Sequence, residues 1–168
     1  MQIRLAGLVP ESIVDGPGYR FAVFVQGCPH ACPGCHNPKT HDFSGGYMAD
    51  TDEIIAKLGA NPLVRGVTLT GGEPMMQAEA LCMIAEAAKE KGLSVWCYTG
   101  FTLEALLQAQ DGDCMRLLEY VDVLVDGPYI AAERSLELLY CGSRNQRLID
   151  MPKTLAAGEI RLYEPDVW

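Results

Sequence analysis

The sequence contains no long apolar run, no cluster of basic residues and no export signal. None of its apolar runs reaches the roughly 18 residues that a membrane-spanning helix needs, and the N-terminal stretch MQIRLAGLVPES lacks the layout of a secretory signal. We therefore expect a cytoplasmic protein with no membrane partner. The net charge of −9, from 13 basic and 22 acidic residues, also argues against a nucleic-acid partner, because phosphate backbones are bound mainly by clustered Lys and Arg.

No internal repeat, low-complexity tract or linker rich in Gly, Ser or Pro divides the 168 residues. A chain of this length suits one domain with a single sizeable core. We therefore expect one domain over residues 1–168. Residues 150–168, DMPKTLAAGEIRLYEPDVW, form a C-terminal extension for which the sequence suggests no role.

The seven cysteines are an odd number, and no export signal accompanies them. A disulfide framework is therefore not expected, and clustered thiols in a reducing compartment indicate a metal or redox site. Three of the cysteines lie close together in the segment GCPHACPGCHN (27–37), namely Cys28, Cys32 and Cys35. The others are Cys82, Cys97, Cys114 and Cys141. We expect the first three of these four to pack in the core, since free cysteine behaves as a small hydrophobe, whereas the last is ambiguous.

Apolar runs rich in β-branched and aromatic residues alternate with segments of helical character. The runs that predict strands are 19–27, 64–72, 93–100 and 121–128, with RNQRLID (144–150) as a further candidate. The segments that predict helices are 51–60, capped by Asp50 or Thr51, then 77–92, and one or two helices within 102–120. This alternation predicts an α/β fold with parallel strands. Both a doubly wound sheet and a (β/α) barrel fit it, but a full barrel needs about 200 residues, so a barrel here would be partial.

Each predicted strand is followed at once by glycine together with a polar or sulfur-bearing side chain. The four strand ends read GCPHACPGC (27–35), GGEP (71–74), YTGF (98–101) and DGPY (126–129). The carboxyl ends of parallel strands lie at one edge of a sheet, where such folds place their sites. We therefore expect these four segments to converge on one site.

The cysteine spacing C-x3-C-x2-C leaves several ligand sets open. A structural zinc site needs four ligands, which His30 or His36 would have to complete, and no second cysteine pair is present. A thioredoxin-like pair would use two thiols and leave the third unexplained. A [4Fe–4S] cluster held by three thiolates fits better, because its fourth iron stays open for a small molecule, as an open position does at a catalytic zinc.

Taken in order along the chain, these motifs resemble those of the radical S-adenosylmethionine (SAM) enzymes. The cysteine motif and GGEP carry that resemblance, and DGPGYR (15–20) is similar to the activating enzymes of glycyl radical enzymes. CPGCHN, VLVDGP and CGSRNQ (141–146) narrow it to the family that activates anaerobic ribonucleoside-triphosphate reductase. The resemblance implies a partial (β/α) barrel of the radical SAM type with two cofactors, a [4Fe–4S] cluster and SAM. It also implies reductive cleavage of SAM that leads to a glycyl radical on the reductase.

The resemblance implies roles for particular residues. The cluster ligands, catalytic through the metal that they bind, would be Cys28, Cys32 and Cys35. The residues that bind SAM would be Gly71, Gly72, Glu73, Pro74, Thr99 and Asp126. Glu73 would accept a hydrogen bond from the SAM ammonium, with a solvated turn residue as the competing interpretation. For Thr99 and Asp126 the competing interpretation is turn capping.

The resemblance also implies protein partners. The residues that contact the partner's glycine loop would be Asp15, Gly16 and Arg20, with a purely structural turn as the alternative. The partners would be the large glycyl radical subunit of the reductase and an electron donor such as flavodoxin or ferredoxin. A homodimer is compatible with the resemblance, and the sequence does not determine the oligomeric state.

Some features depart from the family pattern or lie outside it. Gly34 stands where many radical SAM enzymes have an aromatic residue, and His36 where other members have Tyr. The histidines, His30, His36 and His41, are expected to be loop residues. Ser143, Asn145 and Gln146 match the branch signature but receive no physical role. Two other functions stay open: an activator of another glycyl radical enzyme, such as pyruvate formate-lyase, and a non-catalytic iron–sulfur or zinc protein.

Overall fold

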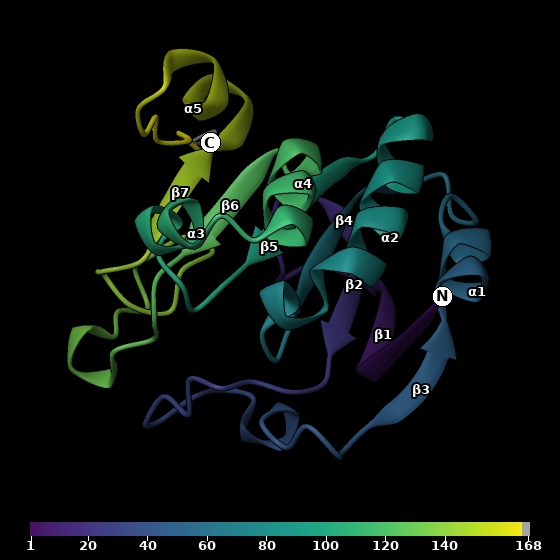
Figure 1. Ribbon diagram of the computed structural model, residues 1–168, viewed down its shortest axis with the longest axis horizontal. Coiled ribbons are helices and arrows are strands. Elements are labelled where there is room, and N and C mark those ends of the chain that lie inside the picture. Colours follow the sequence, from purple (N-terminus) through teal and green to yellow (C-terminus); the bar gives the residue numbers. More distant parts are fainter. Residues whose placement is uncertain (166–168) are drawn as a thin grey trace.

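The computed structural model describes residues 1–165, in which seven strands form one mixed sheet with the order β3-β1-β2-β4-β5-β6-β7 (Figure 1). The strands are β1 Gln2–Ser12, β2 Tyr19–Val25, β3 Tyr47–Asp50, β4 Val64–Gly71, β5 Ser94–Tyr98, β6 Val123–Asp126 and β7 Arg147–Asp150. The α-helices are α1 Thr51–Lys57, α2 Ala78–Glu90, α3 Leu103–Ala109, α4 Gly112–Tyr120 and α5 Met151–Ala157. Short 3-10 helices are η1 Pro38–Thr40, η2 Pro74–Gln77 and η3 Ala131–Glu133.

The four predicted strands β2, β4, β5 and β6 form the parallel centre of the sheet. Consecutive neighbours pair in parallel, as in the registers Ala22 with Thr68 and Leu69 with Cys97. Their carboxyl ends therefore share one edge, toward the lower part of Figure 1, where the long loops gather. The prediction of an α/β fold with parallel strands is confirmed for this part of the sheet.

Three antiparallel strands extend this centre, and two of them do not stand out in the sequence. β1 pairs with β2, and its ladder shifts register around Gly7 and Pro10, the residues that interrupt its apolar alternation. β3 is only four residues long and pairs antiparallel with β1. At the other edge β7 pairs antiparallel with β6, within the candidate segment 144–150. In the described part of the chain β3 and β7 are the two end strands of this order and do not pair with each other, so the sheet is open.

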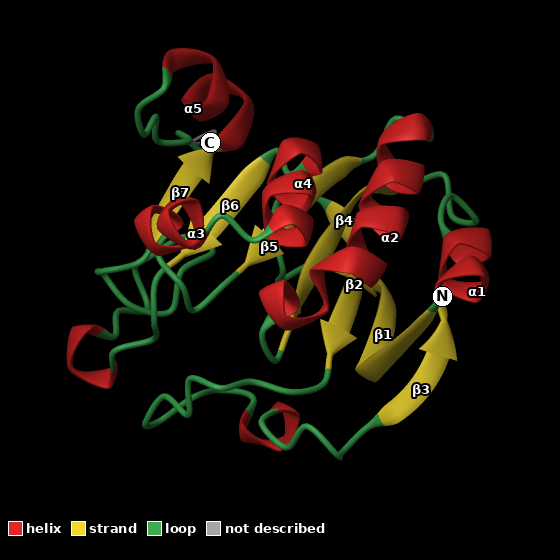
Figure 2. Cartoon of the chain, in the orientation of Figure 1, coloured by secondary structure: helices red, strands yellow, loops and turns green. Residues whose placement is uncertain are grey.

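Helices α1, α2, α3 and α4 lie on one face of the sheet (Figure 2). Side chains alternate along β5, so Val95 and Cys97 join the core beneath the helices while Trp96 packs on the opposite face. Cys82 and Cys114 are buried in the same core. The three cysteines expected to pack in the core therefore do so.

The helices begin where the sequence places capping side chains. The Asp50 carboxylate accepts a hydrogen bond from the Asp52 N–H at the start of α1, as expected. Thr102 does the same at α3 and Asp111 at α4, and each cap satisfies an N–H that has no partner within the first helical turn. These caps fix where each helix leaves its strand.

Part of the C-terminal extension continues the fold. Asp150 caps α5 by accepting from the Lys153 N–H at 3.0 Å, and Met151 is fully buried. An antiparallel bridge joins Ile149 to Leu162. Like the other helices within residues 1–165, α5 is too short or too polar to cross a membrane. The end of the extension, 166–168, lies outside the described residues.

The sheet face opposite the helices carries a buried arginine. Arg20 is 1% exposed, and its guanidinium donates to Thr68 Oγ1 at 2.7 Å, to Ser94 Oγ at 3.0 Å and to the Val67 carbonyl at 3.0 Å. Its Cζ lies 5.6 Å from the centroid of the Trp96 ring, close enough for a cation–π contact. Burial lowers the pKa of Arg20 to about 10. Neutral acceptors and an aromatic ring therefore hold this cation in place.

Replacing Arg20 by Met should destabilise the fold. The substitution removes several buried hydrogen bonds at once, and we expect the free energy of unfolding to fall by about 2 kcal/mol. Urea denaturation measures this as a lower midpoint. The control is Arg161→Met, since the Arg161 side chain is 52% exposed and pairs with Glu159; it should change stability by less than about 0.5 kcal/mol. An R20M protein as stable as the wild type would contradict the structural role of Arg20.

Candidate active site

The three clustered cysteines lie on an irregular loop, residues 26–46, that joins β2 to β3 and is called here the cysteine loop. Backbone hydrogen bonds fold it back on itself, with Cys28 N–H donating to the His41 carbonyl at 3.2 Å and Cys35 N–H to the Cys32 carbonyl at 3.1 Å. Ala31, between the first two cysteines, has a φ of +48°, uncommon for a residue other than glycine. The loop thus has a defined shape despite its lack of regular structure.

All three thiols of this loop open into one hollow, called here the thiol pocket, with a volume of about 130 Å³. Cys28, Cys32 and Cys35 are half-buried and free. The other walls come from 70–73 at the end of β4, from 98–100 at the end of β5 and from Gly127 and Tyr129 after β6. The structure therefore brings the four strand ends together, as the sequence predicts.

The described residues form no ready site for a single metal ion. Within residues 1–165, no group of three or more Cys, His, Asp or Glu side chains gathers around a point that would hold one metal ion. A [4Fe–4S] cubane binds each thiolate through a different iron, so its ligands stand further apart than those of one zinc ion. Burial raises the pKa of the Cys28 thiol, and a bound metal would favour the thiolate instead.

Glu73 lines the thiol pocket and is 1% exposed. Its Oε1 accepts from the Gly100 N–H at 2.7 Å and from His30 Nε2 at 2.6 Å. Its Oε2 accepts from the Met75 N–H at 2.9 Å and from the Thr99 hydroxyl at 2.9 Å. A carboxylate offers about four acceptor positions, so these donors satisfy it fully. Glu73 is therefore not solvated, although it caps η2 as a turn residue would, and its acceptor positions are filled by protein donors.

Gly71 and Gly72 allow two strand ends to meet. Gly71 has a φ of +101°, and Gly72 donates its N–H to the Val25 carbonyl at 2.8 Å. The next N–H, of Glu73, donates to the Gly27 carbonyl at 2.8 Å. A Cβ on Gly72 would lie 2.3 Å from that same Gly27 oxygen. The glycines therefore bring the GGEP turn against the start of the cysteine loop, in addition to lining the pocket.

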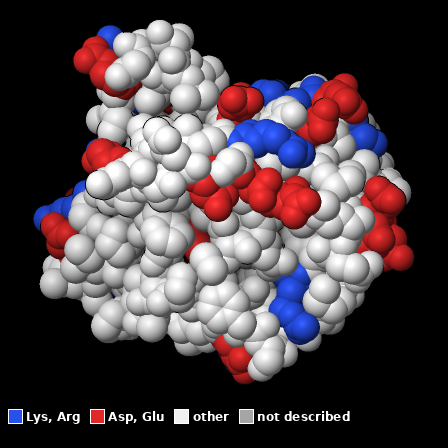
Figure 3. Space-filling model, in the orientation of Figure 1, with Lys and Arg blue, Asp and Glu red and all other residues white. Residues whose placement is uncertain are grey.

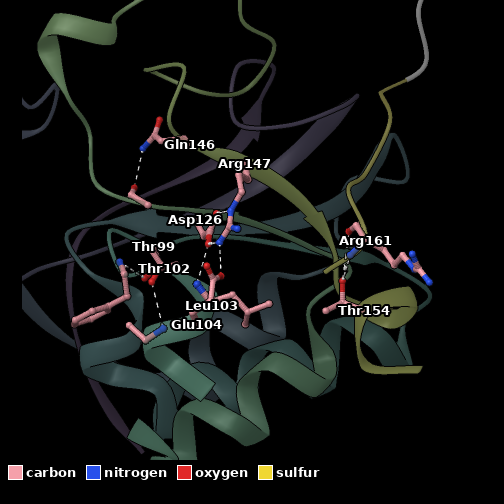
Figure 4. A network of polar contacts seen from close by, with 12 residues as sticks. Thr99, Thr102, Leu103, Glu104, Asp126, Gln146, Arg147, Thr154 and Arg161 are labelled. Carbon is pink, nitrogen blue, oxygen red and sulfur yellow. Dashed lines mark hydrogen bonds and ion pairs between the residues drawn. The ribbon is translucent and has the colours of Figure 1, made fainter. Parts of the chain in front are cut away.

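Two residues expected to bind SAM are not among those that line the thiol pocket. Pro74 is buried at the first position of η2. Asp126 is 1% exposed and accepts from the Leu103 N–H at 2.8 Å and from Arg147 Nε at 3.0 Å (Figure 4). Arg147 also pairs with Glu104, and these hydrogen bonds raise the pKa of the guanidinium. The geometry of Asp126 matches the competing interpretation of capping, since it ties β6 to the start of α3 and to β7.

A second hollow adjoins the thiol pocket and is called here the tyrosine annex. It has a volume of about 380 Å³, within the range of small-molecule sites. The two hollows share Cys35, Thr70, Tyr98, Tyr129 and Gln146. Further walls of the annex include Asp15, Tyr140 and Cys141. Burial, with a contribution from Asp126, raises the pKa of Cys141 to about 11, so the thiol stays neutral. The two hollows thus lie side by side and share part of their walls.

Ser143, Asn145 and Gln146 fasten the loop that follows β6. Gln146 Nε2 donates to the Gly127 carbonyl at 3.1 Å (Figure 4), and Asn145 Nδ2 donates to the Pro128 carbonyl at 2.7 Å. Ser143 is fully buried and donates its hydroxyl to Asn145 Oδ1 at 2.6 Å. These contacts fix one wall of both hollows. The sequence alone does not reveal this role because each amide reaches a carbonyl distant in the chain.

The segment 15–20 lies on the face of the sheet opposite the helices. The Asp15 carbonyl accepts from Thr68 Oγ1 at 2.6 Å, and Gly16 is buried with a φ of +130°. Arg20, the last residue of the segment, donates to the Pro17 carbonyl at 3.4 Å, and its burial does not favour the direct partner contact expected from the resemblance. Val14, just before the segment, is 76% exposed and lines the annex. Asp15 and its neighbours therefore lie at the mouth of the annex, with Arg20 below.

Exposed apolar side chains lie on this side of the molecule. Leu136 is 89% exposed and Leu139 is 52% exposed, in the segment that leads into Tyr140 of the annex. In the view of Figure 3, charges of both signs are interspersed over the helices, whereas the lower left, where Figure 1 shows the loops, carries few charges. The two exposed leucines thus precede, in the chain, a residue that lines the annex.

Comparison with known proteins first gives a class. A family model described as "4Fe-4S single cluster domain" matches residues 14–149, a span that contains the cysteine loop and both hollows. Because this span is most of the chain, the chain belongs to the class of 4Fe-4S single cluster domains.

Named relatives narrow this class. A protein from Vibrio cholerae called anaerobic ribonucleoside-triphosphate reductase-activating protein is 38% identical over 145 residues, which cover 82% of this chain and 91% of the relative. A protein of the same name from Haemophilus influenzae is 35% identical with the same coverage. One from Enterobacteria phage T4 is 34% identical over 84% of this chain and 90% of the relative. The chain belongs to the family of anaerobic ribonucleoside-triphosphate reductase-activating proteins.

A crystal structure of QueE from Escherichia coli is a more distant match. It has a TM-score of 0.48 and 21% identity, over 61% of this chain and 54% of that chain. No conclusion rests on this partial likeness.

Replacing Gly72 by Ala should damage cluster binding and SAM binding together. The new Cβ would meet the Gly27 carbonyl at 2.3 Å, so the GGEP turn and the cysteine loop would have to separate. Iron and sulfide content and SAM binding, measured on anaerobically reconstituted protein, check this outcome. Gly112→Ala is the control, because nothing lies within 4 Å of a Cβ added there. A G72A protein that keeps its cluster and loses only SAM binding would show that Gly72 contacts SAM and does not position the cysteine loop.

Proposed function

We propose that this protein is a radical SAM activase that generates a glycyl radical on anaerobic ribonucleoside-triphosphate reductase. The thiol pocket carries the proposal, because three free thiols and one buried carboxylate meet there at the carboxyl ends of parallel strands. The names of the relatives point to the same partner. The open sheet, with helices on one face, is compatible with a partial (β/α) barrel of the radical SAM type in a single domain over 1–168.

The donor set of the thiol pocket fits a [4Fe–4S] cluster bound by Cys28, Cys32 and Cys35, with SAM beside it. Bound and reduced, this pair of cofactors supplies an electron for the cleavage of SAM and a carbon radical that accepts a hydrogen atom from glycine. The protein itself supplies three thiolates, a confined space and a fixed negative charge. The last of these is the Glu73 carboxylate, oriented in part by the Thr99 hydroxyl.

The groups around Glu73 suit the positive charges of SAM. A carboxylate in a water-poor pocket attracts an ammonium or sulfonium more strongly than it would in water. Gly71 and Gly72 bring the backbone against the same space without a side chain in the way. Pro74 and Asp126 contribute to the site indirectly, because Pro74 begins η2 and Asp126 accepts a hydrogen bond at the start of α3.

The tyrosine annex suits the part of the reaction that must exclude water. Its walls include Tyr98, Tyr129 and Tyr140, and burial raises the pKa of Tyr98, so that phenol stays protonated. The exposed apolar side chains beside the annex, such as Leu136, would gain contact with a protein partner that covers it. The segment with Asp15 and Gly16 would face the partner's glycine loop.

Other partners and the location follow from the same chemistry. Reduction of the cluster needs an electron donor such as flavodoxin or ferredoxin, and a homodimer remains compatible with the family. The seven cysteines of the sequence, four of which line a pocket, suit a reducing cytoplasm.

Cysteine substitutions test the proposed cluster. Cys32→Ala should abolish both the cluster and the release of 5′-deoxyadenosine from SAM, because it removes one of the three ligands. Cys82→Ala is the matched control. Cys82 lies on α2 and packs in the core, so its replacement should leave both properties nearly intact. Iron and sulfide analysis and chromatography of the SAM products measure the outcome. A wild-type protein that binds one zinc and no iron would overturn the proposal.

Replacing Asp15 by Ala should separate SAM binding from action on the partner. Asp15 lines the annex and not the thiol pocket, so SAM affinity should stay almost unaltered while the radical yield on the reductase falls strongly. Electron paramagnetic resonance of the partner's glycyl radical measures the yield, beside a SAM-binding assay on the same protein. Glu11→Ala, an exposed change on the same hairpin, serves as the control. A D15A protein with the radical yield of the wild type would show that the segment 15–20 is a structural turn and does not act on the partner.

A further inference from the structure

His30 joins the cysteine loop to the carboxylate of Glu73. The distance from His30 Nε2 to Glu73 Oε1 is 2.6 Å, shorter than the bonds from Gly100, Met75 and Thr99 to this carboxylate. Those three other donors all follow β4 or β5. His30 is thus the one donor in this set that comes from the cysteine loop, two residues after Cys28 and two before Cys32.

The ring of His30 is held in place on two further sides. It meets the Phe101 ring edge to face, with the centroids 4.5 Å apart and the planes at 73°. Gly100 leaves room for it, because a Cβ on that residue would lie 2.5 Å from the His30 ring. The YTGF segment thus contacts both partners of this hydrogen bond. Thr99 and Gly100 donate to the Glu73 carboxylate, and Phe101 packs against the His30 ring.

We propose that His30 is a positioning residue that fixes Glu73 and thereby couples the cysteine loop to the SAM pocket. The inference rests on the proposed function, in which Glu73 supplies the charge that attracts SAM. An ionised carboxylate can only accept, so His30 Nε2 must donate in this contact. One hydrogen bond then links the segment that holds the cluster ligands to the group that faces the second cofactor.

The consequence of losing this donor follows from the burial of Glu73. A buried carboxylate left with an unfilled acceptor position either takes up water or turns away from its remaining donors. Either change displaces the charge from the place where the ammonium of SAM would lie. The affinity for SAM should fall even when the cysteine loop keeps its cluster.

Two substitutions separate the hydrogen bond from the packing of the ring. His30→Phe keeps a flat ring against Phe101 but cannot donate. His30→Gln loses the ring but carries an amide N–H that can occupy the place of Nε2. Both proteins and the wild type are reconstituted anaerobically, and three quantities are measured: iron and sulfide content, SAM affinity, and the change that SAM causes in the electron paramagnetic resonance spectrum of the reduced cluster.

We expect H30F to keep its cluster and to bind SAM about tenfold more weakly, since one bond to a charged group is lost. Its spectrum should respond to SAM only at correspondingly higher SAM concentration. H30Q should recover most of the affinity. In cluster-free wild-type protein labelled with ¹⁵N-histidine, one Nε2–H should be protected from solvent exchange, and Glu73→Ala should abolish that signal.

Several results would overturn the inference. An H30F protein with unchanged SAM affinity would show that Glu73 does not need this donor, and one with tighter binding would show that His30 competes with the ligand. If H30F loses cluster but the remaining cluster-containing protein binds SAM with unchanged affinity, His30 stabilises the cysteine loop and does not position Glu73. Absence of a protected Nε2–H in the cluster-free wild type would show that the bond does not form. A wild-type protein that binds no SAM would instead refute the proposed function itself.

Discussion

The buried carboxylate of Glu73 is the group on which the site depends most. A charge removed from water is costly unless donors surround it, and here the donors come from the cysteine loop, the first turn of η2 and the end of β5. Segments that are far apart in the sequence must therefore lie at fixed distances from one another. The free-energy cost of removing one carboxylate from water thus constrains the relative positions of three segments.

Backbone contacts provide the second constraint. The GGEP turn approaches the start of the cysteine loop so closely that only glycine fits at Gly72. On the opposite side, Asn145 and Gln146 hold the loop after β6 by its carbonyl groups. The pocket is therefore made of irregular segments that are each tied to the end of a strand. This explains how a site without regular structure keeps a defined geometry.

The sequence predicts the parallel centre of the sheet well, because each strand there is a continuous apolar run bounded by glycine and followed by a capped helix. It does not predict β1, whose alternation is interrupted by Gly7 and Pro10, or the four-residue β3. The sequence also predicts that Glu73, Thr99 and the three clustered cysteines lie at one site, because the carboxyl ends of parallel strands share an edge, and the structure places them there.

The errors concern the direction of side chains. Every residue of β6 is buried, so periodicity cannot tell that Asp126 points toward α3 and Arg147. Arg20 lies where the DGPGYR motif overlaps the predicted strand 19–27, and its burial and its packing on Trp96 show that the side chain points inward. The contacts of Ser143 and Gln146 also depend on which loops the fold brings together. Such facts are properties of the tertiary structure and leave no local trace in the sequence.

The cysteine loop has one more consequence, which concerns how it is held in place. Among the described residues, none from 26–46 belongs to either hydrophobic cluster, so the core does not depend on this loop. Segments of this kind open locally at far smaller free energy than the global unfolding of a domain. The apolar core and the cofactor site are therefore different parts of the molecule. The loop that carries the three thiols is held by hydrogen bonds to strand ends, such as that from His30 to Glu73, and not by apolar packing.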